Sequence, residues 1–286
     1  MSLTLPVACC GGAAGSVAGG MPAKGRDVVT ASEAAVLIER HDRVAVISLN
    51  RPERLNAWSA DLGNGLLERL QEAAADDSIG GVILTGAGRG FSAGADLKNP
   101  NTHTVESMED HLASRQRMPV FDVIEKYPKP IISAVNGYAV GIGCLVPLCC
   151  DFILASEKAV FCLPQVSLGI LPAYGGTLRL ARFVGRGNAL NIALTGRKVG
   201  AEEALRMGIV VSVHAPEELL PEAIRTMAAI ASMPVHAVRL ARESLFHGYE
   251  SGLAATEQAD AFRFMALAQT RDTAGRHQAW RDGRRT

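Results

Sequence analysis

The sequence lacks an excess of charge of either sign and lacks a long apolar run. Its 286 residues carry 29 Lys and Arg against 29 Asp and Glu, so the formal net charge is zero. Nucleic-acid binding needs basic residues in excess to neutralise phosphates, and this composition offers none. No apolar run approaches the ~20 residues that a membrane-spanning helix requires. We therefore expect neither nucleic acid nor membrane as a partner.

The sequence also lacks the cysteine and histidine spacings that bind metal. None of its six cysteines forms a C-x-x-C pair, and no histidine lies near enough in sequence to complete a zinc set. We expect buried, reduced thiols, no bound metal and a cytoplasmic location. The cysteines are Cys9, Cys10, Cys144, Cys149, Cys150 and Cys162.

The composition is that of a soluble globular protein, with 48% hydrophobic and 20% charged residues. Residues 1–32 are rich in Gly and Ala and lack the pattern of a signal peptide, so we expect a flexible N-terminal tail. Strands alternate with helices to about residue 213, and helices complete the chain. This order predicts an α/β core with largely parallel sheets over residues 33–225 and a helical section over residues 226–286.

Several individual elements can be predicted within this order. Two β-rich runs flank the turn His41–Arg43 and predict a hairpin. Ser59 or Asp61 can cap a helix that extends to about Ala75. The stretch GIGCLVPLCC, residues 141–150, predicts one buried helix, and an amphipathic helix is expected from about Ser107 to Glu125.

The stretch GRGFSAGAD, residues 88–96, contains the G-x-S-x-G spelling of a nucleophile elbow around Ser92. Such an elbow needs a strand, a sharp turn and then a helix, whereas Pro100 follows here and blocks a long helix. Asp151 with His214 or His236 could complete a triad only nominally. A serine hydrolase therefore remains a remote alternative.

A second interpretation of the same stretch uses backbone amides instead of the serine. A similar glycine turn occurs at Asn136–Cys144, again after a strand and before a helix that starts near Ile142. Two such turns could bring two N–H groups to one developing oxyanion. The same glycines could also serve only as turn residues, so both interpretations stay open from the residues alone.

Several stretches of the sequence together match the pattern of a known family. LNRPERLNAWS, GVILTGAGRGFSAGADLK, KPIISAVNGYAVGIGC and the stretch from CDFILASE to LARFVG occur in that order. Together they resemble the crotonase family, the enoyl-CoA hydratase/isomerase superfamily. The resemblance implies a spiral of ββα units, trimers or pairs of trimers, and stabilisation of a thioester enolate. It assigns the two N–H donors to Ala95 and Ile142, which would leave Ser92 as a turn residue.

The resemblance also implies an acyl-CoA thioester as substrate and no tightly bound cofactor. Coenzyme A would enter only as part of that thioester. Asp96 would be a structural carboxylate of the turn. The residues expected to border the coenzyme A moiety are Arg54, Leu55, Ala95, Asp96, Leu97 and Lys98.

The sequence departs from the family where its hydratases carry two glutamates. Leu145 and Gln165 stand at those positions, and neither can transfer a proton as a carboxylate does. Tyr174 is the best titratable candidate nearby, and His103 or His111 could serve as a base. Isomerisation, decarboxylation, C–C bond chemistry and hydration through a water on Gln165 all stay open. A non-catalytic acyl-CoA-binding homologue is the alternative.

Overall fold

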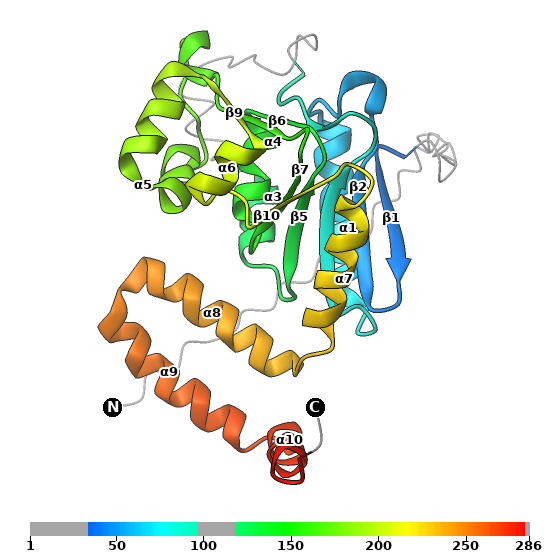
Figure 1. The fold of residues 1–286 in the computed structure, drawn as a ribbon, viewed down its shortest axis with the longest axis vertical. Coiled ribbons are helices and arrows are strands. Elements are labelled where there is room, and N and C mark those ends of the chain that lie inside the picture. The colour runs from blue at the N-terminus through cyan, green and yellow to red at the C-terminus, as the bar shows by residue number, and fades with distance from the viewer. Residues whose placement is uncertain (1–33, 97–117, 284–286) are drawn as a thin grey trace, which may run out of the picture.

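The computed structural model describes residues 34–96 and 118–283. Its larger sheet has six strands in the order β1-β2-β3-β5-β7-β10 (Figure 1). The first pair, β1 and β2, is an antiparallel hairpin, and the other neighbouring pairs are parallel. The strands are β1 (Val36–His41), β2 (Val44–Leu49), β3 (Gly81–Gly86), β5 (Ile131–Val135), β7 (Ile153–Ser156) and β10 (Ser212–His214).

A second sheet has four short strands in the order β4-β6-β8-β9. Three of them directly follow strands of the larger sheet, since β4 follows β3, β6 follows β5 and β8 follows β7. The chain therefore passes repeatedly from one sheet to the other, and each passage creates a turn between the two layers. The strands are β4 (Gly90–Ser92), β6 (Tyr138–Val140), β8 (Val160–Cys162) and β9 (Lys198–Gly200).

Helices cover both faces of the six-stranded sheet because side chains alternate along each strand. In β2, Ala45 and Ile47 pack in the cluster that contains α1, whereas Val44 and Val46 pack in the cluster that contains α7. Ser59 is the N-cap of α1, and its Oγ accepts from the N–H of Leu62 at 3.2 Å. The helices around the core are α1 (Ala60–Ala75), α3 (Pro119–Glu125), α4 (Ile142–Leu145), α5 (Gly176–Thr195), α6 (Ala201–Met207) and α7 (Leu219–Ala231).

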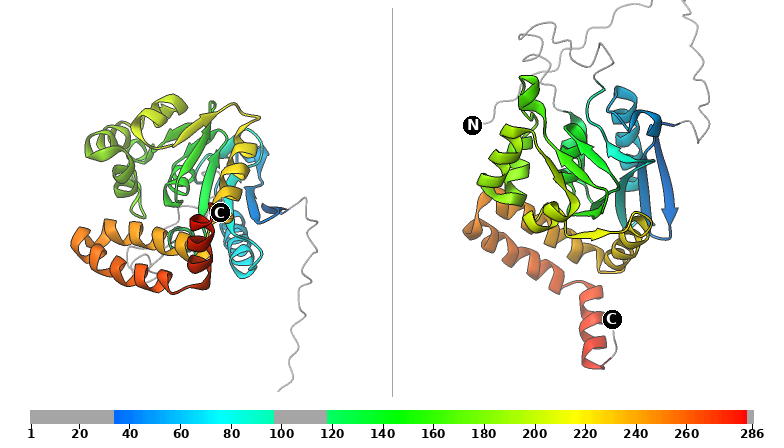
Figure 2. Two further views of the ribbon diagram at one scale, coloured as in Figure 1. Left: turned by 60° about the horizontal axis from the view of Figure 1, so that its bottom comes forward. Right: turned by 45° about the horizontal axis from the view of Figure 1, so that its top comes forward.

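Three further helices complete the described chain: α8 (Val235–Ser251), α9 (Leu253–Ala268) and α10 (Arg271–Arg281). We call residues 235–281 the C-terminal arm. Figure 2 shows that α8 and α9 run side by side and that α10 turns away from them. No residue of these helices is buried in the single chain. The predicted boundary at residue 226 lies within α7, which packs on the six-stranded sheet.

The predicted α/β class with a helical C-terminal section is confirmed, and so is the hairpin, whose Asp42 has a φ of 51°. The single helix expected over residues 141–150 is wrong. The chain forms the short α4, and then a 3-10 turn η3 (Pro147–Cys149), because Pro147 cannot donate the hydrogen bond that a continuous helix needs. Of the helix expected from Ser107, the structure describes only the part that includes α3.

Candidate functional site

Two glycine turns meet where the short strands β4 and β6 end. Gly94 has a φ of +89° and Gly141 a φ of +55°, values that residues with a Cβ rarely adopt. The turns are in direct contact, because a Cβ placed on Gly94 would lie 2.7 Å from the carbonyl oxygen of Val140. Strands β4 and β6 pair in parallel, so their carboxyl ends bring the two turns together.

Each turn contains at least one backbone N–H that has no protein acceptor among the described residues. In the first turn, Ala93 and Asp96 donate their N–H groups to Leu55 and Trp58, and the Gly94 N–H approaches Ser92 Oγ. The Ala95 N–H takes no part in these bonds.

In the second turn, Ile142 is the first residue of α4, and the N–H groups of a first helical turn have no partner within the helix. Cys144 and Leu145 donate to the Gly141 carbonyl, whereas the Ile142 N–H donates to no described residue. The N–H groups of Ala95 and Ile142 thus directly follow two glycines that touch each other, and neither N–H has an acceptor among the described residues.

Ser92 is fully buried and holds the first turn in place. Its hydroxyl donates to the carbonyl of Asn56 at 2.8 Å and lies 3.3 Å from the N–H of Gly94. A Cβ placed on Gly143 would lie 2.3 Å from the Ser92 carbonyl oxygen, so α4 packs directly against this residue. These contacts give Ser92 a structural position, and no histidine bonds its hydroxyl within the described chain.

Asp96 closes the first turn and faces two arginines. Its Oδ2 lies 3.8 Å from Nη2 of Arg51 and 3.9 Å from Nη1 of Arg54. The Asp96 side chain is only 10% exposed, whereas that of Arg54 is 51% exposed and reaches the surface. Leu55 follows in a left-handed conformation, and its carbonyl accepts from the N–H of Ala93 at 2.9 Å. Leu97 and Lys98, expected to continue this surface, lie outside the described residues.

Two residues that contact the first turn cannot be identified from the sequence. Arg51 donates to the carbonyl of Ala57 at 3.0 Å as well as facing Asp96. The carboxamide of Asn56 accepts from the N–H of Arg51 at 2.7 Å and donates to the carbonyls of Ala87 and Gly90. Asn56 is fully buried with a left-handed φ of 54°, and its hydrogen bonds hold residues 51–56 against residues 87–90.

Leu145 and Gln165 occupy different settings beside the second turn. Leu145 is 1% exposed, and its Cδ2 would lie 2.8 Å from a Cβ on Gly176, so it packs between α4 and α5. Gln165 opens the 3-10 turn η4 (Gln165–Leu168), and its Nε2 would lie 3.7 Å from a Cβ on Gly141. The Oε1 atom of Gln165 is buried without a hydrogen-bond partner in the described structure.

Tyr174 precedes α5 in a left-handed conformation, with a φ of 57°. A bulky residue adopts this conformation only at a cost of about 1–2 kcal/mol, which the surroundings must offset. The ring of Tyr174 lies 5.4 Å from that of Phe121 in α3, and Nε of Arg179 donates to its carbonyl at 3.0 Å. Arg179 also pairs with Glu125, so α3 and α5 hold the loop around Tyr174 together.

The described cysteines are poor candidates for nucleophiles. Cys144, Cys149, Cys150 and Cys162 are all buried and free of disulfides. Burial raises the pKa of Cys144 to about 12 and raises the pKa of the other three thiols as well. The thiols therefore stay protonated at neutral pH. Over residues 34–96 and 118–283, no group of three His, Cys, Asp or Glu side chains could hold a metal ion.

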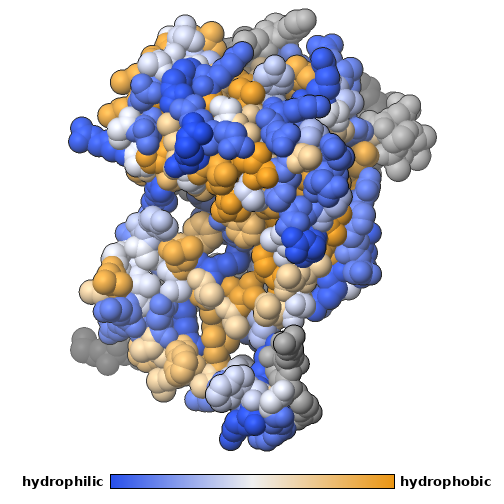
Figure 3. Space-filling view, in the orientation of Figure 1, coloured by the Kyte–Doolittle hydropathy of each residue, from blue (hydrophilic) through white to orange (hydrophobic). Residues whose placement is uncertain are grey.

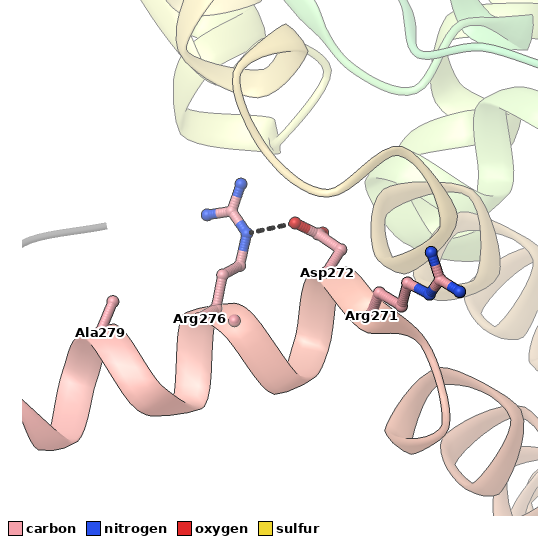
Figure 4. Close-up of a pocket in the computed structure, with 5 residues that line it drawn as sticks. Arg271, Asp272, Arg276 and Ala279 are labelled. Carbon is pink, nitrogen blue, oxygen red and sulfur yellow. Dashed lines mark hydrogen bonds and ion pairs between the residues drawn. The ribbon is translucent and has the colours of Figure 1, made fainter.

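A shallow hollow on α10 lies away from both turns. It is lined by one face of the helix, where Nε of Arg276 lies 3.3 Å from Oδ1 of Asp272 (Figure 4). Arg271 points outward beside this pair, and Ala279 adds only a methyl group (Figure 4). No residue of the two glycine turns lines this hollow. In the described chain, no helix is long and apolar enough to cross a membrane.

Comparisons of the chain with known proteins all indicate the same family. The profile of the family described as Enoyl-CoA hydratase/isomerase matches residues 39–284. The chain is 38% identical over 237 residues to the "Probable enoyl-CoA hydratase" of Rhizobium meliloti (strain 1021), covering 83% of this chain and 91% of that protein. It is 37% identical over 230 residues to the "Crotonyl-CoA hydratase" of Syntrophomonas wolfei, covering 79% and 88%. The crystal structure of an enoyl-CoA hydratase from Bacillus anthracis superposes with a TM-score of 0.81 at 34% identity, covering 87% and 97%.

Proposed function

Because the chain belongs to the enoyl-CoA hydratase/isomerase family, we propose that it binds an acyl-CoA thioester and stabilises the enolate formed from it. The N–H groups of Ala95 and Ile142 are the proposed donors to the thioester oxygen. The observation that carries the proposal is that both amides lack a described acceptor in two turns that touch each other.

The energetic reason lies in where the charge develops. When a proton leaves the carbon next to the thioester, or a nucleophile adds to the conjugated double bond, negative charge moves onto the thioester oxygen. A fixed backbone donor aimed at that oxygen contributes about 3–4 kcal/mol of transition-state stabilisation. Ala95 and Ile142 are held by tight packing of the turns, so their N–H groups need little reorganisation during the reaction.

The coenzyme A moiety would extend from the first turn toward Arg54. The half-exposed guanidinium of Arg54 can contact a phosphate, while Asp96 keeps it oriented from behind. Leu55 and Ala95 would border the pantetheine arm. Leu97 and Lys98 keep this role as a prediction from the sequence. Coenzyme A belongs here to the substrate, and no tightly bound cofactor is proposed.

The proton-transfer groups distinguish this chain from a hydratase with two glutamates. We place Leu145 and Gln165 at those two positions by resemblance, and neither side chain can exchange a proton at neutral pH. Tyr174 is the proposed proton carrier, since its side chain is 37% exposed at the edge of the loop that precedes α5. The proposed reaction class is that of a hydratase/isomerase-type enzyme.

The assembly proposed is a homotrimer or a pair of trimers in the cytoplasm. Exposed apolar side chains on the C-terminal arm support the oligomer, and they include Leu245, Phe262, Phe264 and Trp280. Figure 3 shows apolar side chains gathered in the hollow between the core and this arm.

A non-catalytic acyl-CoA-binding protein is the second candidate function, supported by the apolar Leu145 at one proposed glutamate position. Incubation with a panel of acyl-CoA thioesters, followed by mass spectrometry and a parallel binding measurement, separates the two functions. Binding without any change of mass, and without exchange of the α-proton in deuterated water, would favour the non-catalytic protein.

The amide donors are tested most directly at Ile142, because proline is tolerated at the first position of a helix. Ile142→Pro removes the N–H, whereas the control Ile142→Ala keeps it and shortens the side chain. We expect Ile142→Pro to lower the rate of α-proton exchange about 100-fold to 1000-fold. Its far-UV circular dichroism spectrum should stay the same as that of the wild-type protein. Ile142→Ala should retain most of the activity. Equal rates in the two variants would contradict the proposed donor.

A further inference from the structure

The loop between β3 and β4, residues 86–90, is held by the side-chain amides of two asparagines. Each Nδ2 donates to two of the loop's carbonyl oxygens, so both asparagines use their full donor capacity on this loop. Asn56 binds the carbonyls of Ala87 at 3.0 Å and Gly90 at 2.8 Å, and Asn136 binds those of Gly86 at 2.8 Å and Gly88 at 2.9 Å. We call these two side chains the carboxamide clamp.

Asn136 holds the loop at the expense of its own side-chain oxygen. With Nδ2 turned toward the loop, Oδ1 of Asn136 is buried and has no hydrogen-bond partner among the described residues, which is destabilising. The reverse orientation would point Oδ1 at the carbonyl oxygens of Gly86 and Gly88, which cannot donate to it. The side chain is therefore oriented by its two bonds to the loop.

The clamped loop leads directly into the first glycine turn. Gly90 is the first residue of β4, which ends at Ser92, two residues before Gly94. The backbone of Asn56 adds a second connection, because its carbonyl accepts from the hydroxyl of Ser92 at 2.8 Å. Asn56 thus holds both ends of β4, and the Ala95 N–H lies three residues beyond this strand.

The same loop also supports the segment that leads to the second glycine turn. Asn136 and Gly137 directly precede β6, which ends two residues before Ile142. A Cβ placed on Gly137 would lie 2.1 Å from the carbonyl oxygen of Arg89, so this segment packs directly on the loop. Strands β4 and β6 begin at paired residues. The clamp therefore ties both donor-bearing turns to one loop.

We propose that Asn56 and Asn136 are positioning residues that set the separation of the Ala95 and Ile142 N–H groups. They act through the loop at residues 86–90 and not by contact with the thioester. Two donors stabilise one developing oxyanion only while both point at it, and a hydrogen bond weakens steeply as its geometry departs from the ideal. This inference rests on the proposed function, since it assumes that the two amides bind a thioester oxygen.

Infrared difference spectroscopy tests the donor positions without requiring turnover. The probe is butyryl-CoA labelled with ¹³C at the thioester carbonyl. Hydrogen bonds to a carbonyl oxygen weaken its double bond, so the wild-type protein should lower the stretching frequency of the bound probe relative to the free one. Loss of either half of the carboxamide clamp should reduce this shift and broaden the band, because the two amides no longer hold one fixed separation.

Two variants open the clamp from its two sides. Asn56→Gly removes one carboxamide at a left-handed position, with a φ of 54°, that glycine adopts without strain. Asn136→Ala removes the other at a partly buried position, and it decides the test if Asn56→Gly does not fold. Both should lower the rate of α-proton exchange at saturating butyryl-CoA about 10-fold to 100-fold. In Asn136→Ala the butyryl-CoA concentration at half-maximal rate should change less than about threefold, because the loss falls mainly on the transition state.

Asn188→Ala is the matched control. Nδ2 of Asn188 donates to the carbonyl of Val184 at 3.1 Å within α5, so this variant loses a side-chain bond of the same type outside the clamp. It should keep the wild-type carbonyl band and the wild-type exchange rate.

The outcomes separate this inference from the proposed function. A wild-type carbonyl band that persists in Asn56→Gly and Asn136→Ala overturns the positioning role and leaves the thioester site intact, even where urea unfolding shows that both variants are less stable. A change of the same size in Asn188→Ala also overturns it, because the loss of any such bond would then suffice. A wild-type protein that binds butyryl-CoA without lowering the carbonyl frequency, or that binds no thioester, contradicts the proposed function itself.

Discussion

The core and the C-terminal arm are both rich in apolar residues, but the core buries them and the arm leaves them exposed. Every residue of β3, β5 and β7 is buried. In contrast, α8, α9 and α10 have no buried residue, and Phe264 and Trp280 are 73% and 79% exposed. The core buries its apolar side chains within one chain, whereas the arm leaves them exposed on the single chain, which is the pattern of an interaction surface.

Two arginine pairs connect the arm to the core through side chains that the structure describes. Arg242 in α8 donates to Asp151 at 2.7 Å and to the carbonyl of Tyr127 at 2.8 Å. Arg182 in α5 pairs with Glu250 in α8 at 2.6 Å. Mutations in the two regions should therefore have different effects, since the core is held by packing and the arm is held to it by a few polar contacts.

The largest difference in the free energy of unfolding is expected between a core substitution and an arm substitution of similar type. Ile132→Ala should lower the free energy of unfolding by about 4 kcal/mol, because Ile132 is fully buried between the sheet and α7 and leaves a cavity. Phe264→Ala should change the stability of the single chain by less than about 0.5 kcal/mol, because its side chain is exposed.

Urea unfolding and sedimentation measure the two effects separately. Phe264→Ala should shift the protein from oligomer to monomer at micromolar concentration, whereas Ile132→Ala should keep the assembly below its unfolding transition. An unchanged oligomer in Phe264→Ala, together with a loss of stability as large as in the core variant, would mean that the arm packs as the core does.

Arg242 should have the next largest effect, because it is the buried connection between the regions. The side chains of Arg242 and Asp151 are only 14% and 12% exposed. Arg242→Ala leaves a buried carboxylate without its cation and should cost about 3 kcal/mol at neutral pH. The double variant Arg242→Ala with Asp151→Asn removes the charge and should recover part of that loss in urea unfolding.

The loss should depend on pH with a defined sign. Burial raises the pKa of Asp151 above its usual 3.8, while the hydrogen bond and charge of Arg242 lower it, so removing Arg242 raises the pKa further. A carboxyl with a higher pKa in the folded chain binds more protons there, so stability falls as the pH rises through this range. The deficit of Arg242→Ala should therefore shrink as the pH is lowered toward 3.8. A deficit that is constant with pH would contradict this account of Asp151.

The elements that could be predicted from the sequence are those with local signals. The hairpin follows from two β-rich runs around the predicted turn His41–Arg43, and α1 follows from apolar spacing behind the cap Ser59. The strands β4 and β6 cannot be predicted, because three residues are too few to show an alternation of apolar and polar side chains. The sequence indicates only glycine turns in both segments.

The candidate site was predicted through the resemblance, which names two backbone N–H groups as well as side chains such as Arg54 and Asp96. Ala95 and Ile142 were identified through resemblance, together with the glycines that precede them. Arg51 and Asn56 were missed because their roles depend on contacts that the sequence does not reveal, such as that of Asn56 with Gly90 at 34 residues' separation. The unpaired oxygen of Gln165 has the same origin, since it depends on the packing of η4 against the second turn.

The smallest effect is expected at Glu250, the exposed counterpart of the buried arginine pair. Arg182 and Glu250 are 32% and 68% exposed, so solvent screens their attraction. Glu250→Gln keeps the size and hydrogen-bonding capacity of the side chain and removes its charge. We expect a change of less than about 0.5 kcal/mol in the free energy of unfolding, and a smaller one at high salt. A loss as large as that of Arg242→Ala, measured in the same urea titration, would instead make this exposed pair the main attachment of the arm.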